Sequence, residues 1–146
     1  MTDGATTEEA VEAALRALHH RDRSAGEIDR KLELRGVPED ERRSALETLI
    51  RTGLVDDRRF AETRAANLAA RGAGDAFIRH DLARAGVAGE VIDGAIGALE
   101  GERERAEAIV ARRGGGAKTA RYLAGKGFSD DVVHAVVARG DDEPLG

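Results

Sequence analysis

The chain contains one glycine-rich string that ends in lysine and threonine, the residue types that bind phosphate groups. It occupies residues 114–119. A phosphate-binding loop requires Gly directly before the Lys and another Gly five residues earlier, so that backbone N–H groups surround the phosphates. Those two places hold Ala117 and Arg112, and no strand-like segment precedes them. We therefore interpret the string as a break between helices rather than a phosphate site.

Carboxylate and imidazole groups offer no catalytic or metal-binding arrangement. Asp56 and Asp57 are adjacent, and no other carboxylate or histidine stands at a motif spacing from them. Acidic residues are favoured where a helix begins, because the first N–H groups lack partners there. The histidines are adjacent to each other or isolated, at His19, His20, His80 and His134. Since the chain also lacks Cys, we expect no enzyme activity, no metal and no cofactor.

Basic residues form the most distinctive charged feature. The segment 112–126 carries five cations and no acid, which are Arg112, Arg113, Lys118, Arg121 and Lys126. A solvated surface and a binding patch for an anionic partner both remain open for this segment. If it is only solvated, the interface is expected around a second set of arginines, which are Arg21, Arg23, Arg58 and Arg64.

The overall composition narrows the class of protein. The chain has 146 residues and a net charge of −5, which argues against a general nucleic-acid binder, since such proteins are usually basic. Aromatic residues make up 3% of the chain, so no large stacking platform for bases is available. No apolar run approaches 18 residues, and the N-terminus is polar and acidic. We expect a cytoplasmic protein without a membrane segment.

A repeated pattern indicates how these residues are positioned. The pattern is Leu, three residues, Gly and then Val or Phe, and it occurs at Leu32 with Gly36, Leu82 with Gly86, and Leu123 with Gly127. In each copy the Leu fits the buried stripe of a helix, and the Gly fits the position just after the helix end. The copies are 50 and 41 residues apart, a period that is typical of a repeated helical unit.

The pattern predicts an all-α protein, an elongated tandem array of three three-helix repeats with about nine helices. We place the repeats at 1–53, 54–100 and 101–140, followed by an acidic tail at 141–146. Ser24 and Glu27 form a capping-box pattern at the start of the second helix. The expected apolar faces are Val11, Leu15 and Leu18 in the first helix, and Ala45, Leu46, Leu49 and Ile50 in the third.

The middle of the chain resembles the RecX family of regulatory proteins. The resemblance lies in Arg23-Ser24, Glu27, Leu32 and Gly36, and above all in the string Gly53-Leu-Val-Asp-Asp-Arg-Arg-Phe-Ala61, which includes Asp56, Asp57 and Phe60. Further along, Ile78, Leu82 and Gly86 also stand where the family would place them. The similarity covers about residues 15–138.

This resemblance implies tandem three-helix repeats, binding to the RecA recombinase filament on DNA, and inhibition of recombination and of the ATPase and coprotease activities of RecA. It implies no catalytic residue. Two interpretations of the function remain open. One is a monomeric regulator that binds the filament through protein contacts, with at most weak direct DNA binding. The other is a helical nucleic-acid-binding module that uses the 112–126 segment, and binding to DNA without RecA would distinguish them.

Overall fold

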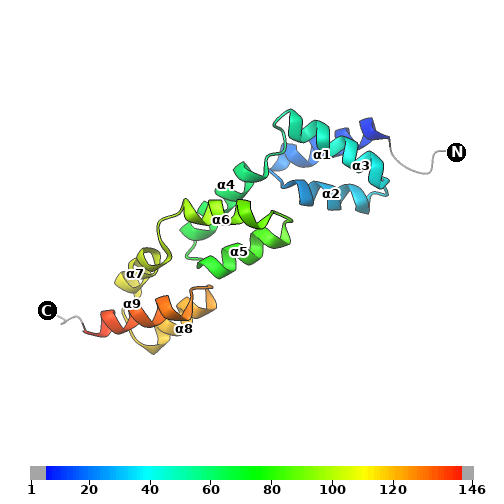
Figure 1. The fold of residues 1–146 in the computed structure, drawn as a ribbon. Helices are drawn as coiled ribbons and strands as arrows, with labels where there is room; N and C mark the ends of the chain where they lie inside the picture. Colours follow the sequence, from blue (N-terminus) through cyan, green and yellow to red (C-terminus); the bar gives the residue numbers. More distant parts are fainter. Residues whose placement is uncertain (1–5, 143–146) are drawn as a thin grey trace.

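Residues 6–142, which the computed structural model describes, form nine α-helices and no strand (Figure 1). In chain order the helices are α1 (Thr7–His20), α2 (Ala25–Leu34), α3 (Glu39–Arg51), α4 (Asp57–Ala70), α5 (Asp75–Arg84), α6 (Gly89–Gly97), α7 (Glu102–Arg113), α8 (Ala117–Gly125) and α9 (Asp130–Asp142). The prediction of an all-helical chain is confirmed.

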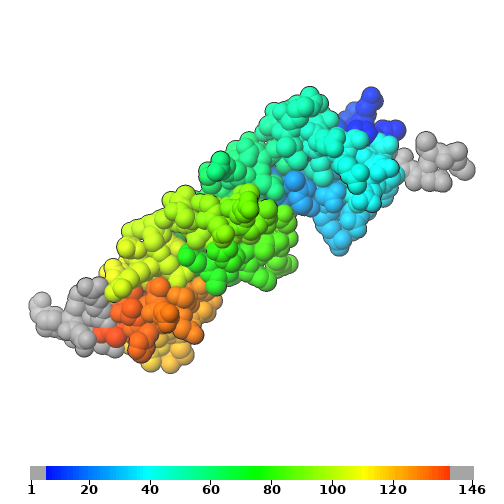
Figure 2. Space-filling model, viewed as in Figure 1, coloured from blue at the N-terminus to red at the C-terminus, as the bar shows by residue number. Residues whose placement is uncertain are grey.

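The helices pack in three groups that follow one another along an elongated body (Figures 1 and 2). We call α1–α3 the first group, α4–α6 the second and α7–α9 the third. Each group has its own hydrophobic core, which includes Ile28 and Leu49 in the first group, Phe60 and Ile78 in the second, and Ile109 and Phe128 in the third. The tandem array of three-helix repeats is therefore confirmed.

The repeated Leu–Gly pattern is the end of the second helix in every group. In the first group, the N–H of Val37 donates to the carbonyl of Leu32, and the N–H of Gly36 donates to that of Glu33. This pair of bonds is a Schellman motif, which closes a helix through a residue in the left-handed region. Gly36 has φ +82°, a conformation that costs energy for any residue with a Cβ. The same two bonds recur around Gly86 and Gly127.

The N-termini of the helices are capped largely as expected. Ser24 accepts a hydrogen bond from the N–H of Glu27, and the Glu27 carboxylate accepts one from the N–H of Ser24, so the predicted capping box is present. Asp56 caps α4 by accepting from the N–H of Arg59. Pro38 occupies the corresponding position before α3, where its missing N–H has no cost.

Two predicted apolar faces differ from the structure. The α1 helix buries Ala10, Ala14 and Ala17, whereas Leu15 is 41% exposed. The small alanine side chains of α1 pack against α3. The larger Val11 and Leu18 are only partly buried, at the edge of the core. On α3, Ile50 is 53% exposed and lies outside that core, while Ala45 and Leu49 are buried as predicted.

The predicted domain limits at 53 and 100 fall in the linkers between α3 and α4 and between α6 and α7. As limits of units that fold independently, they stay predictions. The predicted tail at 141–146 overlaps the last two residues of α9, and residues 143–146 lie outside the described part of the chain.

Candidate functional site

Contacts between neighbouring groups hold the potential binding surfaces in place. At the first junction, where α2 approaches α4 and α5, the hydroxyl of Ser24 donates to the carbonyl of Ala85 at 2.5 Å. The N–H of Ala25 donates to the Asp57 carboxylate at 2.7 Å. Asp57, which begins α4, therefore caps a helix of the preceding group rather than its own.

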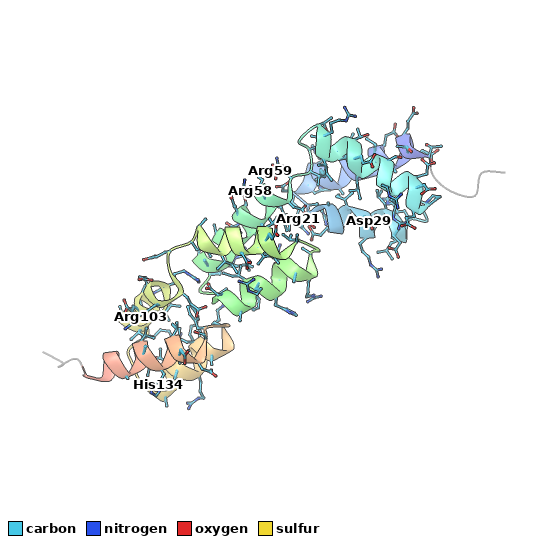
Figure 3. The ribbon with its side chains drawn as sticks, in the orientation of Figure 1. Arg21, Asp29, Arg58, Arg59, Arg103 and His134 are labelled. Carbon is cyan, nitrogen blue, oxygen red and sulfur yellow. The ribbon has the colours of Figure 1, made fainter. Side chains whose placement is uncertain are left out.

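Arg59 reinforces the first junction from the side of α4 (Figure 3). It donates two hydrogen bonds of 3.1 Å to Asp22, and it also donates to the carbonyls of Gly53 and Leu54. The hydrogen bonds to Asp22 raise the pKa of the Arg59 guanidinium. Asp22 precedes α2, so this ion pair joins the first group to the second.

The second junction joins α5 to α7 and α8 mainly through the backbone. The N–H of Gly74 donates to the carbonyl of Lys126 at 2.8 Å, and the N–H of Ala76 donates to that of Gly127 at 3.1 Å. Glu102 is the first residue of α7, and it accepts from the N–H of Asp75 at 2.8 Å. Glu102 thus has the role at this junction that Asp57 has at the first.

Arg105 closes the second junction. Its guanidinium donates to the carbonyls of Ala73 and Glu100 at 2.8 Å each, and it also pairs with Asp75. Its Cζ lies 5.9 Å from the centre of the Phe128 ring. This junction is therefore tied by side chains as well as by the backbone.

The predicted basic segment lies on the third group, around the break between α7 and α8. Arg112, Arg113, Lys118 and Arg121 are exposed, and Lys126 is half-buried at the second junction. None of the five forms an ion pair with a side chain that the structure describes. The guanidinium of Arg113 lies 3.7 Å above the ring of Tyr122, so cation and aromatic face are combined on this surface.

The positive charge of the third group is local. Residues 112–126 carry five cations and no acid, whereas the three helices as a whole, residues 102–142, contain eight Lys or Arg and seven Asp or Glu. The structure places the basic segment at one end of an acidic molecule.

The second predicted set of arginines does not form one cluster with the basic segment. Arg21 and Arg58 lie near the first junction, away from the third group (Figure 3). Arg21 pairs with Glu27 at 3.1 Å, whereas Arg58 is exposed without an ion pair among the described side chains. Arg64 is bound to Asp81 through two hydrogen bonds of 2.8 and 3.0 Å, which raise the pKa of Arg64. Its charge is thus already compensated within the second group.

A groove between α2 and α5 was missed by the sequence analysis. It has a volume of about 580 Å³, and its lining includes Arg23, Lys31, Leu34 and Arg84. A second hollow of about 340 Å³ continues it along α5 to Phe77 and shares Arg84 with it. No local signal reveals the groove, because it forms only where α2 and α5 approach each other.

Two kinds of site are not found in the described residues. No group of three or more His, Asp or Glu side chains within residues 6–138 is arranged to hold a metal ion. In the same part of the chain, no helix has the length and apolar content needed to cross a membrane.

Comparisons with known proteins agree with this architecture. Residues 10–49 match the family model for the first three-helix domain of RecX, and residues 56–96 match the model for its second three-helix domain. The crystal structure of RecX from Lactobacillus salivarius superimposes with a TM-score of 0.79 over 92% of this chain and 96% of that one, at 21% identity, which supports the fold.

Relatives extend the match over almost the whole chain. The regulatory protein RecX of Halorhodospira halophila is 33% identical, over 96% of this chain and 93% of the relative. That of Xanthomonas axonopodis pv. citri is 35% identical, over 86% and 83%. Both relatives are described as regulatory proteins. On this evidence, the chain belongs to the RecX family of regulatory proteins.

Proposed function

We propose that this protein binds the RecA recombinase filament on DNA and inhibits recombination and the ATPase and coprotease activities of RecA, without catalysis of its own. The observation that carries the proposal is the match to regulatory proteins of the RecX family over 96% of the chain. The string from Gly53 to Ala61, which suggested the family, supplies the first-junction residues Asp57 and Arg59 and the buried Phe60. We place its action in the cytoplasm, as a monomer.

An elongated array suits a partner that is itself extended. Three groups in a row present a long surface (Figure 2). The cations around α7 and α8 offer attraction to the phosphates of a nucleoprotein filament, while the rest of the acidic chain is repelled. The contact is therefore expected to be oriented, with the third group nearest the DNA.

The test is a titration of the ATPase activity of the cognate RecA on single-stranded DNA. We expect the rate to fall at ratios of this protein to RecA at or below one to one, and strand exchange to fall in parallel. Circular dichroism should first establish that the added protein is folded. A folded preparation that leaves both activities unchanged would contradict the proposal.

A second candidate function is direct binding of nucleic acid by the basic segment. The observation in its favour is the combination of unpaired cations with the Arg113–Tyr122 stack, since cations and aromatic faces together bind single strands. Each phosphate contact on single-stranded DNA should add about 0.7 to the slope of log affinity against log salt. Fluorescence anisotropy with labelled single-stranded DNA and no RecA measures this slope directly.

A charge-reversal variant tests whether the basic segment is used. Arg112→Glu, Arg113→Glu and Arg121→Glu together should weaken filament binding and flatten its salt dependence, because phosphate contacts are lost. The matched control is Arg16→Glu, Arg43→Glu and Arg51→Glu, which makes the same charge change at exposed positions of the first group. If both triple variants behave alike, only the total charge matters and the segment is a solvated face.

A further inference from the structure

The groove between α2 and α5 has the strongest unused binding chemistry in the described part of the chain. Its walls come from two different groups, with Arg23, Lys31 and Leu34 on one side and Arg84 on the other. It also contains acids, so its usable charge depends on which side chains are already paired.

The acids of the groove are already bound to other residues of the protein. Glu27 accepts from Arg21 and from the N–H of Ser24. Asp29 pairs with Arg42 at 3.0 Å, and Glu33 pairs with Arg30 at 3.7 Å. In the adjoining hollow, Asp81 holds Arg64 through two hydrogen bonds. These carboxylates are consequently compensated and offer little to a ligand.

Three of the four cations of the groove have no such partner among the described side chains, and the fourth, Arg30, pairs with Glu33. Lys31 and Arg84 form no ion pair with any side chain that the structure describes. Arg23 is more telling, because its Nε is buried and has no hydrogen-bond partner. A buried donor without an acceptor is rare and costs free energy, and it leaves the charge of Arg23 uncompensated within the protein. The available charge of the groove is therefore positive.

An exposed apolar side chain lines the groove, and another lines the adjoining hollow. Leu34 is 72% exposed and Phe77 is 46% exposed, which makes them two of the few large apolar side chains on the described surface. A nucleic-acid strand has no aliphatic side chain that could cover Leu34. An extended peptide can instead combine carboxylates, which bind the unpaired cations, with an apolar residue that covers Leu34.

We propose that the groove between α2 and α5 binds an acidic, extended segment of the partner protein. Carboxylates of that segment occupy the positions facing Arg23, Lys31 and Arg84, and one of its apolar side chains covers Leu34. Arg23 is suited to this role because a guanidinium binds carboxylate through parallel N–H donors. The assignment rests on the proposed function, since the recombinase is taken as the partner that supplies the segment. It gives the protein two separate contacts, with protein bound at the groove and phosphates at the third group.

The first experiment compares three double variants for binding to cognate RecA assembled on single-stranded DNA. Lys31→Glu with Arg84→Glu should weaken binding about tenfold or more, because two charge-assisted contacts become repulsive. Lys31→Arg with Arg84→Lys keeps both charges and should bind like the wild type. Arg43→Glu with Arg51→Glu reverses two exposed charges outside the groove and should have a much smaller effect. Thermal melts followed by circular dichroism confirm that all three are folded.

The second experiment identifies the occupant. A photoreactive benzoylphenylalanine in place of Leu34 should crosslink to a RecA peptide rich in Asp and Glu, as mapped by mass spectrometry. Crosslinking to DNA, or to a RecA segment without acidic residues, would overturn the assignment. If wild-type protein binds RecA and the Lys31→Glu, Arg84→Glu variant binds equally well, the groove is wrong and the proposed function stands. If the wild type does not bind RecA at all, both are overturned.

Discussion

Phe60 is a single side chain on which the second group depends. It lies in the first turn of α4, is 3% exposed, and packs with Ile78 and Leu82 in a core otherwise rich in alanine. Phe60→Ala should lower the free energy of unfolding by about 3–5 kcal/mol, because it removes a buried ring and leaves a cavity. Urea unfolding followed by circular dichroism measures the loss. Phe77→Ala is the matched control, since Phe77 is 46% exposed, and equal losses would show that Phe60 is no anchor.

Two glycines in the same motif separate backbone strain from steric contact. Gly36 and Gly127 both have positive φ, at +82° and +95°, so either one replaced by Ala should cost about 1–2 kcal/mol from the left-handed conformation. A Cβ at Gly36 would meet nothing within 4 Å, whereas one at Gly127 would lie 2.6 Å from the Cβ of Phe77. Gly127→Ala should therefore be clearly more destabilising than Gly36→Ala in thermal melts. Similar melting temperatures for the two variants would show that the second junction is not closely packed.

At the scale of elements, α5 is a helix that begins without a side-chain cap of its own. Gly74 stands at its N-cap, and the first N–H groups are satisfied by the carbonyls of Lys126 and Gly127 and by Glu102. The Glu102 carboxylate also accepts from the N–H of Ser129 at 3.1 Å. The Glu102 carboxylate thus caps the N-terminus of α5 and also accepts a hydrogen bond at the start of α9.

The substitution Glu102→Gln tests whether both N–H groups need the carboxylate of Glu102. An amide has one acceptor oxygen, so one of the two N–H groups loses its partner, at a cost of about 1–3 kcal/mol. Hydrogen exchange at the amides of Asp75 and Ser129 should speed up in the variant. Glu104→Gln makes the same chemical change in the same turn of α7 at an exposed position and should leave both amides unaffected. Unchanged protection in Glu102→Gln would mean that water replaces the carboxylate at no cost.

The ends of the helices could be predicted from the sequence better than the residues that pack against the helices or cap them from a distance. The Leu–Gly pattern predicted the close of α2, α5 and α8, because a Schellman motif is built from neighbouring residues. The buried face of α1 was predicted wrongly, because helical spacing permits both the alanine stripe and the stripe through Leu15, and only packing against α3 decides between them. The capping of α2 by Asp57 also lay beyond sequence reasoning, since it joins residues 32 positions apart.

At the scale of the whole molecule, the sequence indicated a long array but not its main groove. The period of the repeat predicted the three groups, and the basic segment was visible as a run of cations. The groove depends on which acids are compensated by Arg21, Arg42 and Arg64, and these pairs are made by the tertiary structure. A count of the charges along the sequence therefore does not show that the groove has unpaired cations, because it does not show which acids are paired.

Small-angle scattering tests the shape. A compact protein of this length would have a radius of gyration of about 15 Å, and the array should exceed that value clearly, with a mass that corresponds to a monomer. A chelator should leave the far-UV circular dichroism unchanged, because the helices are held by apolar cores and caps. A radius of gyration near that of a compact globule, or loss of helicity with the chelator, would contradict this view of the fold.

The N-terminus of α5 is capped by residues that follow it in the chain, and this affects when α5 is completed during synthesis. The ribosome releases the N-terminus first, and it adds about 5–20 residues per second. The first group carries its own capping box at Ser24, and the other cap of α2, Asp57, follows only 32 residues after Ala25, so the start of α2 is complete earlier. The start of α5 has to wait for Glu102 and then for Gly127, a delay of about 3–10 s. The middle of the protein is thus completed together with its C-terminal end, and a pause in translation near residue 100 would hold it unfinished.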